Sequence, residues 1–246
     1  MRTAVVILNW NGREWLQRFL PGVIANTPDA EVIVADNGST DDSLAWLAAT
    51  YPALRTLPLD GNHGFAGGYD RALAQVTADR YVLLNSDVEV TPGWIAALNA
   101  YLDSQPGMVA CQPKVLSYRD RNRFEHAGAA GGYIDRNGYP FCRGRIFEIT
   151  EPDTGQYDSD TDVFWATGAC LMIDAQAFHA VGCWLLEKAF KFIPGPLKSV
   201  FDGIGKVFQG TNGDGFLWWI LARAVGFCQE GDYHLHVALC AQCARL

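Results

Sequence analysis

Three short apolar runs in the first half of the chain each end in polar residues. They are residues 5–8, which lead into Asn9, residues 32–35, which lead into Asp36, and residues 81–84, which lead into Asn85-Ser86-Asp87. Continuous apolar runs of this length are typical of strands that are buried on both faces of a parallel sheet. In an open α/β sheet, ligands bind in the crevice at the carboxyl ends of the strands. We therefore expect three groups of polar side chains at one edge of a sheet.

Helical spacing of apolar residues fills the segments between these runs. Trp15, Phe19 and Val23 recur at helical intervals, for example. The expected order is strand 5–8, helix 14–24, strand 31–35, helix 43–49, strand 54–58, helix 66–76, strand 81–85, helix 92–104 and strand 108–115. This alternation predicts an α/β fold with a mostly parallel, doubly wound sheet that is flanked by helices.

The pattern changes after residue 124. The segment 127–144 is rich in glycine, and Asn137-Gly138 is a strong signal for a hairpin turn. We expect a hairpin or a long loop over the substrate crevice. Residues 163–173 then return to the character of a strand, and residues 175–181 to that of a short helix.

A helical tail is expected near the C-terminus. The spacing of apolar residues over 197–208 predicts an amphipathic helix, whose apolar face comprises Leu197, Val200, Phe201, Ile204, Val207 and Phe208. Packing of this helix on the domain is the main interpretation, because only Lys198 and Lys206 mark its polar face with positive charge. Peripheral contact with a membrane through residues 197–208 is the alternative.

Composition excludes some classes of protein. A length of 246 residues fits one large domain, or one domain with a tail. A formal net charge of −8 argues against a dedicated nucleic-acid binder and against purely electrostatic attraction to anionic lipid. There is no signal-peptide pattern, no apolar run approaches the ~18 residues of a spanning helix, and the seven cysteines are scattered. These features favour a cytoplasmic protein, with peripheral contact at the inner face of the membrane as a further possibility.

Five motifs together resemble a known family. They are Asn9-Trp10-Asn11-Gly12, Asp36-Asn37-Gly38-Ser39-Thr40-Asp41, Asn62-His63-Gly64-Phe65-Ala66-Gly67-Gly68, Leu84-Asn85-Ser86-Asp87 and Thr167-Gly168-Ala169-Cys170-Leu171-Met172. In this order and spacing they are similar to those of the family-2 glycosyltransferases with the GT-A fold, of the rhamnosyltransferase-like branch. The resemblance implies a catalytic domain over residues 1–183 that binds a nucleotide-diphosphate sugar. Residues 184–246 are atypical of the family, and we expect a helical segment packed on the same domain.

The resemblance also implies donor-binding roles for particular residues. Asp36 is assigned to the uracil or thymine base, because a carboxylate there can accept the imide N–H. The other expected substrate-binding residues are Asn9, Asn37, Ser39, Asn62, Gly67, Asn85 and Ser86. Two structural interpretations stay open, since residues 36–39 suit a turn with a helix cap and the glycines of 64–68 suit close packing of a helix on a sheet.

A divalent metal is expected at Asp87. The resemblance identifies Asn85-Ser86-Asp87 as a shortened form of the family's metal motif. A diphosphate leaving group requires a hard cation, Mg²⁺ or Mn²⁺, and such cations prefer oxygen ligands. Glu89 is expected on the same side as Asp87 if the strand alternation continues. A cap at the end of the strand is the alternative interpretation.

The general base is the weakest part of the resemblance. An inverting transfer needs a carboxylate that takes the proton of the acceptor hydroxyl, and Asp214 in Gly213-Asp214-Gly215-Phe216-Leu217 is the nearest candidate. The arginine of the family motif is replaced here by Ile220.

The implied function is transfer of a hexosyl or deoxyhexosyl unit to a glycan or lipid-linked acceptor in polysaccharide assembly. A nucleotide-sugar-binding protein that has lost catalysis is the alternative. A nucleotidyltransferase fits less well. That class typically has a glycine-rich loop bearing Lys or Arg directly after the first strand, and residues 9–13 lack this character.

Two charged groups outside these motifs are interpreted as structural. Arg143 and Arg145 are expected to be solvated or paired with Glu148 and Glu151. Asp158, Asp160 and Asp162 are expected to form a solvated acidic loop, because the rest of a calcium-binding loop is missing.

Overall fold

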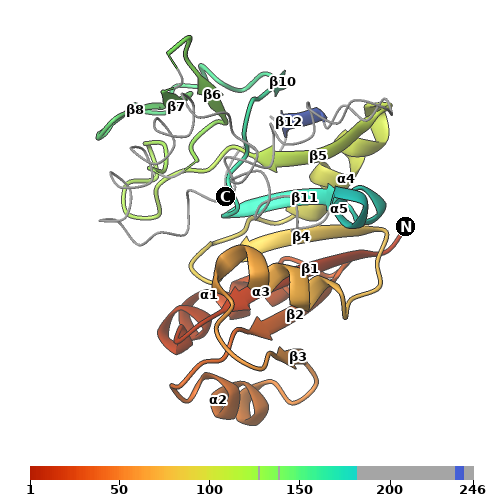
Figure 1. Cartoon of the computed structure of the whole chain (residues 1–246). Coiled ribbons are helices and arrows are strands. Elements are labelled where there is room, and N and C mark those ends of the chain that lie inside the picture. Colours follow the sequence, from red (N-terminus) through yellow and green to blue (C-terminus); the bar gives the residue numbers. More distant parts are fainter. Residues whose placement is uncertain (127, 138, 182–235, 241–246) are drawn as a thin grey trace.

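The computed structural model describes residues 1–126, 128–137, 139–181 and 236–240 (Figure 1). An eight-stranded sheet has the order β10-β12-β5-β11-β4-β1-β2-β3, and a four-stranded sheet has the order β6-β7-β8-β9. The main strands are β1 (Thr3–Asn9), β2 (Glu31–Asp36), β3 (Arg55–Pro58), β4 (Arg80–Asn85), β5 (Met108–Pro113), β10 (Thr161–Asp162), β11 (Cys170–Asp174) and β12 (His236–Cys240). The helices are α1 (Arg13–Ala25), α2 (Ser43–Thr50), α3 (Gly64–Leu73), α4 (Trp94–Ser104) and α5 (Ala175–Val181).

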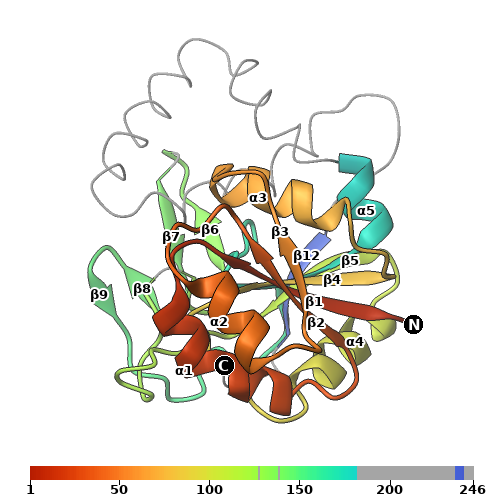
Figure 2. The same cartoon turned by 90° about the horizontal axis from the view of Figure 1, so that it is seen from below.

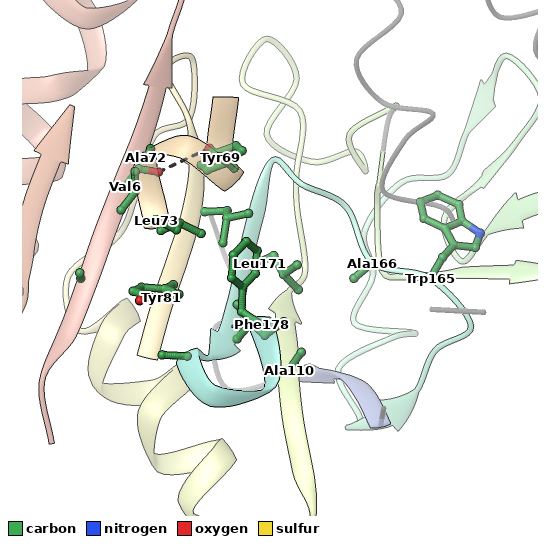
Figure 3. Packing of buried hydrophobic residues seen from close by; sticks show 14 of the residues in the cluster. Val6, Tyr69, Ala72, Leu73, Tyr81, Ala110, Trp165, Ala166, Leu171 and Phe178 are labelled. Carbon is green, nitrogen blue, oxygen red and sulfur yellow. Dashed lines mark hydrogen bonds between the residues drawn. The ribbon is translucent and has the colours of Figure 1, made fainter. Parts of the chain in front are cut away.

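The first half of the chain forms the expected doubly wound unit. Strands β3, β2, β1 and β4 are all parallel, and β1 pairs with β2 on one side and with β4 on the other. Successive residues of β1 face opposite sides, so that Val6 packs with Tyr69 and Leu73 of α3 (Figure 3). Val5 and Ile7 pack on the other face, with residues of α1, α2 and α4. Helices therefore cover both faces of this sheet (Figure 2).

The second half of the large sheet is mixed. Strand β11 lies between β4 and β5 and is antiparallel to both, whereas β12 is parallel to β5. The strand expected over 163–173 is thus confirmed only from Cys170 onward. Before it, the Thr167 backbone N–H donates to the side-chain Oε1 of Gln112 at 2.7 Å, and Trp165 forms a bridge to Gly132 of the small sheet.

The glycine-rich segment builds the small sheet. Strands β6 (Gly132–Ile134), β7 (Pro140–Cys142), β8 (Arg145–Ile146) and β9 (Ile149–Thr150) form an antiparallel meander. The hairpin expected around Asn137 is therefore confirmed. Trp165 lies before β11 and contacts the small sheet, since its ring lies against Gly132 and its Nε1 donates to Tyr133 O at 3.1 Å. The same residue belongs to the core cluster that includes Leu171 and Ala110 of the large sheet.

The C-terminal quarter is described over β12 alone. The expected helix 197–208, its six apolar residues and Asp214 lie outside the described residues, and β12 adds a strand within a segment for which helices were expected. Within the described part of the chain, no helix combines the length and the apolar character needed to cross a membrane.

Candidate donor-binding site at the strand ends

The register of the parallel strands brings the expected polar residues to one edge. Asn9 at the end of β1 lies opposite Asp36 of β2, and Leu8 lies opposite Asn85 of β4. Carboxyl ends of parallel strands share an edge, so residues far apart in the sequence meet there. The edge predicted from the three apolar runs is thus present in the structure.

Asn9 and Asp36 form a buried network beneath this edge. The Asn9 Nδ2 atom donates to Asp36 Oδ2 at 2.9 Å and to Ser39 Oγ at 3.2 Å, and Asp36 Oδ1 accepts the Ser39 backbone N–H at 2.9 Å. Both Asn9 and Asp36 are buried. The Asn9 Oδ1 atom is buried without a hydrogen-bond partner in the described structure, and it would lie 2.5 Å from a Cβ placed on Gly12. A side chain at position 12 would therefore have to displace the Asn9 amide.

Asn37 and Asn62 position the start of α3. The Asn37 side chain accepts the His63 backbone N–H at 3.0 Å and donates to Asn62 Oδ1 at 3.1 Å and to Gly64 O at 2.9 Å. These bonds tie the first turn of α3 to the end of β2. A Cβ on Gly68 would come within 2.9 Å of Leu8, so the close packing of helix on sheet is real at that glycine. Gly67 lies one residue earlier, half-buried, on the same turn.

Asp87 lies in the turn that follows β4. Asp87 is an exposed residue by its accessible surface. The protein atoms around its carboxyl group nevertheless desolvate that group, and this raises the pKa of Asp87. Asn85 and Ser86 beside it are half-buried. One carboxylate with amide and hydroxyl oxygens suits a hard cation that keeps waters and binds substrate phosphates. A bound cation would also favour the charged carboxylate, so the donor set fits Mg²⁺ or Mn²⁺. Among the described residues, no cluster of three or more His, Cys, Asp or Glu forms a site made by protein alone.

Strand alternation does not place Glu89 on the same side as Asp87, contrary to expectation. Strand β4 ends at Asn85, and residues 86–89 form a turn and an irregular segment. The Glu89 carboxylate is bound by Arg121 through two hydrogen bonds of 2.6 and 2.9 Å. This pair connects the segment after β4 to the loop that follows β5.

Asn11 is a site residue that was not predicted individually. Its backbone φ is +50°, and its Oδ1 accepts the backbone N–H groups of Thr40 at 2.7 Å and Asp41 at 3.2 Å. The side chain thereby holds the turn after β2 against the turn after β1. The sequence carried a signal for it, since Asn-Gly after a strand favours a left-handed turn. Asp41 in turn accepts the Ser43 backbone N–H at 3.0 Å, just before α2, whose N-cap residue is Asp42.

Charged residues beyond the strand ends have structural partners. The Lys114 side chain is 3% exposed, with its Nζ 2.8 Å from Asp153 Oδ2 and in contact with Asp158. The segment that carries Asp158 is therefore anchored and not simply a solvated loop. Arg143 donates to Ala130 O and Arg145 to Phe147 O. Arg143 and Arg145 were expected to be solvated or paired with Glu148 and Glu151, and the pairing is not found among the described residues, where Glu148 pairs with His126 and Glu151 accepts from Tyr157.

Comparison with known proteins identifies the family. The model of glycosyl transferase family 2 matches residues 4–182, and the chain belongs to this family. Over 201 residues it is 28% identical to an N-acetylglucosaminyl-diphospho-decaprenol L-rhamnosyltransferase of Mycobacterium tuberculosis. The match covers 72% of this chain and 63% of that protein. The chain thus spans less than two thirds of the length of this relative.

Solved glycosyltransferases share the fold. A crystal structure of GalNAc-T7 with UDP, GalNAc and Mn²⁺ superposes with a TM-score of 0.64 at 15% identity, over 99% of this chain and 42% of that one. Residues 1–349 of S. aureus TarS give a TM-score of 0.50 at 13% identity, over 73% of this chain and 49% of that one. The GT-A architecture expected from the motifs is confirmed.

Proposed function

We propose that this chain is the donor-binding part of an inverting glycosyltransferase. It takes a hexosyl or deoxyhexosyl unit from a nucleotide-diphosphate sugar and transfers it to a glycan or lipid-linked acceptor. The observation that carries the proposal is the meeting of the Asn9–Asp36–Ser39 network and Asp87 at one edge of the parallel sheet. The mycobacterial relative, whose name states a rhamnosyl transfer to a decaprenyl-linked sugar, supports a lipid-linked acceptor.

Asp36 is assigned to the nucleobase. A carboxylate has about four acceptor positions, and Asn9 and the Ser39 N–H each take one of them. The remaining lone pairs can accept the imide N–H of uracil or thymine. Because Asn9 is buried and bonded to Asp36, its proposed part in substrate binding is to orient that carboxylate. Ser39, Asn37, Asn62 and Gly67 are assigned to the neighbouring ribose and diphosphate.

Asp87 is assigned to the metal. It would hold Mg²⁺ or Mn²⁺, with Asn85 and Ser86 as weaker oxygen ligands. When bound, the cation supplies positive charge that stabilises the departing diphosphate. The first turn of α3, which Asn37 and Asn62 hold in place, presents backbone N–H groups that suit the same anion.

Asp214 stays the candidate base, and it decides between the two functions. A transferase requires a carboxylate there that accepts the proton of the acceptor hydroxyl, whereas a donor-binding protein without catalysis does not. Asp214→Asn is expected to abolish transfer to acceptor and to leave donor affinity unchanged. We propose a cytoplasmic location for the protein, with the acceptor reached at the inner face of the membrane.

A calorimetric titration with UDP-, dTDP- and GDP-sugars, with and without Mn²⁺, tests the donor site. The wild-type chain is expected to bind one class of donor more tightly with Mn²⁺. Asp87→Asn keeps the size of the side chain and removes its charge, so it is expected to abolish the effect of Mn²⁺ and leave the melting temperature nearly unchanged. Asp29→Asn is the matched control, because Asp29 is an exposed aspartate in the turn before β2, at the opposite edge of the sheet. Survival of the Mn²⁺ effect in Asp87→Asn would show that the metal assignment is wrong.

A further inference from the structure

The β8–β9 hairpin ends in a cluster of exposed apolar side chains. Ile146, Phe147 and Ile149 are 55%, 79% and 75% exposed, and we call these three residues the apolar hairpin tip. Ile146 pairs with Ile149 across the hairpin, so that only two residues form the turn between them. The hairpin projects away from the large sheet (Figures 1 and 2).

Folding alone does not account for phenylalanine at position 147. Its φ is +51°, in the left-handed region that favours glycine and costs other residues about 1–2 kcal/mol. A side chain that is 79% exposed recovers little of this cost through burial. A bulky apolar residue in a strained, projecting turn is therefore better explained by something that it contacts outside the described structure.

The carbonyls of Phe147 and Thr150 and the carboxylate of Glu148 each have a partner, whereas the Arg145 Nε atom is buried without one in the described structure. The Arg145 guanidinium donates to Phe147 O at 2.9 Å, and Arg123 donates to Thr150 O at 2.5 Å. Glu148, the other turn residue, pairs with His126 at 3.1 Å. A hydrogen-bonded carbonyl costs much less to transfer into an apolar medium than a free one.

We propose that the apolar hairpin tip inserts into the interfacial region of a lipid bilayer. The proposal deepens the proposed function and rests on it for its purpose, which is to bring the strand-end site to a lipid-linked acceptor. A second copy of the chain is a poorer occupant. Three side chains offer roughly a few hundred Å², whereas stable protein interfaces bury about 1,200 Å² or more in total.

Insertion of apolar side chains predicts two properties of vesicle binding. Burial of large apolar side chains contributes about 1.5–3 kcal/mol each, so removal of two of them is expected to lower vesicle affinity by at least tenfold. Apolar insertion is also insensitive to salt, unlike attraction between surface charges, which is largely screened at high ionic strength. The overall net charge of −8 makes binding by charge alone unfavourable.

Co-sedimentation of the full chain with vesicles of equal parts phosphatidylcholine and phosphatidylglycerol tests the proposal. The wild-type protein is expected to pellet with vesicles at low salt and at about 0.5 M NaCl. The double variant Phe147→Gly, Ile149→Thr is expected to lose at least tenfold in affinity. Phe147→Gly relieves the strained turn, so a raised melting temperature of that single variant would separate lost binding from unfolding. Tyr139→Ser is the control, because Tyr139 is 62% exposed on the neighbouring β6–β7 hairpin and is expected to be dispensable.

Several outcomes would overturn the proposal. They are absence of wild-type protein from the pellet, equal pelleting of the double variant, and loss of wild-type binding at high salt. A wild-type dimer that the double variant converts to a monomer, measured by light scattering, would assign the tip to a second copy instead. The donor titration without vesicles is expected to be the same for wild type and double variant, so failure of membrane binding and failure of the donor site are distinguishable.

Discussion

The parallel half of the large sheet and the small antiparallel sheet are stabilised in different ways. Strands β1, β2 and β4 are six or seven residues long and are paired along their length. Strands β6 to β9 have two or three residues each, and β7 meets β8 through a single pair, Cys142 and Arg145. Many similar apolar contacts hold the first region, whereas a few individual contacts hold the second. Loss of one contact should therefore matter far more in the second region.

The buried ion group of Lys114 provides the largest expected effect. Lys114→Met removes a cation that is 3% exposed and leaves the carboxylates of Asp153 and Asp158 without it. Breaking a buried ion pair by removing one partner costs about 3–5 kcal/mol. We expect a loss of this size in the free energy of unfolding, measured by denaturant titration.

Hydrogen exchange locates that loss. Amides of residues 140–152 in the Lys114→Met variant are expected to lose protection before those of β4. Adding Asp153→Asn to Lys114→Met removes one uncompensated charge and should recover part of the stability. Uniform loss of protection over both sheets would contradict the comparison between the two regions.

The parallel region was predictable because its determinants are local. Apolar runs and helical spacing fixed the strands of β1, β2 and β4 to within two residues at each end, and parallel pairing then required Asn9, Asp36 and Asn85 to share an edge. The contacts of the small sheet were not predictable in this way. Lys114 and Asp153 are separated by thirty-nine positions, and no periodic pattern indicates that they meet.

The same limit applies within the site. The sequence indicated that Asn9 and Asp36 are polar residues at strand ends, but not that they bond to each other and are buried. Side-chain orientation at the end of a strand depends on the turns that follow, and Asn11 and Gly12 determine those turns here. Glu89 was misplaced for a related reason, because the strand ended before the alternation reached it.

Glycine substitutions in the two regions should have opposite signs. A Cβ on Gly132 would lie 1.7 Å from the Trp165 ring, so Gly132→Ala must displace the ring that joins the sheets. We expect a loss of about 3 kcal/mol, at the upper end for overpacking. Gly22→Ala in α1 is the matched control, since nothing lies within 4 Å of its added Cβ and it is expected to stabilise the helix by about 0.5–1 kcal/mol. Equal effects in thermal melts would break the comparison.

Asp36 tests whether the parallel region serves binding as well as folding. Asp36→Ala removes the carboxylate that is bonded to Asn9 and to the Ser39 N–H. Affinity for uracil or thymine nucleotides is expected to weaken by roughly 1–3 kcal/mol, the cost of leaving a buried partner unsatisfied. Calorimetric titration measures it, with Asp29→Ala as control. Unchanged affinity would show that Asp36 does not bind the nucleobase.

The smallest expected effect lies where the two regions meet, in the pair of Glu89 and Arg121. Glu89 follows β4 in the parallel region, and Arg121 belongs to the loop that leads to the small sheet. Their side chains are 40% and 63% exposed, so solvent screens the pair, but the double hydrogen bond is the geometry in which an exposed pair contributes most.

A double-mutant cycle with Glu89→Gln and Arg121→Gln is expected to give a favourable coupling energy that falls as salt is added. Arg55 and Glu31 form the control pair, because they have a single contact of 3.2 Å at similar exposure within the parallel region. Coupling there is expected to be smaller, about 0.2–0.5 kcal/mol. If the two cycles give the same value, the Glu89–Arg121 contact is an ordinary surface pair. The connection between the regions then depends on Trp165 and Lys114, which are buried and which salt would not weaken.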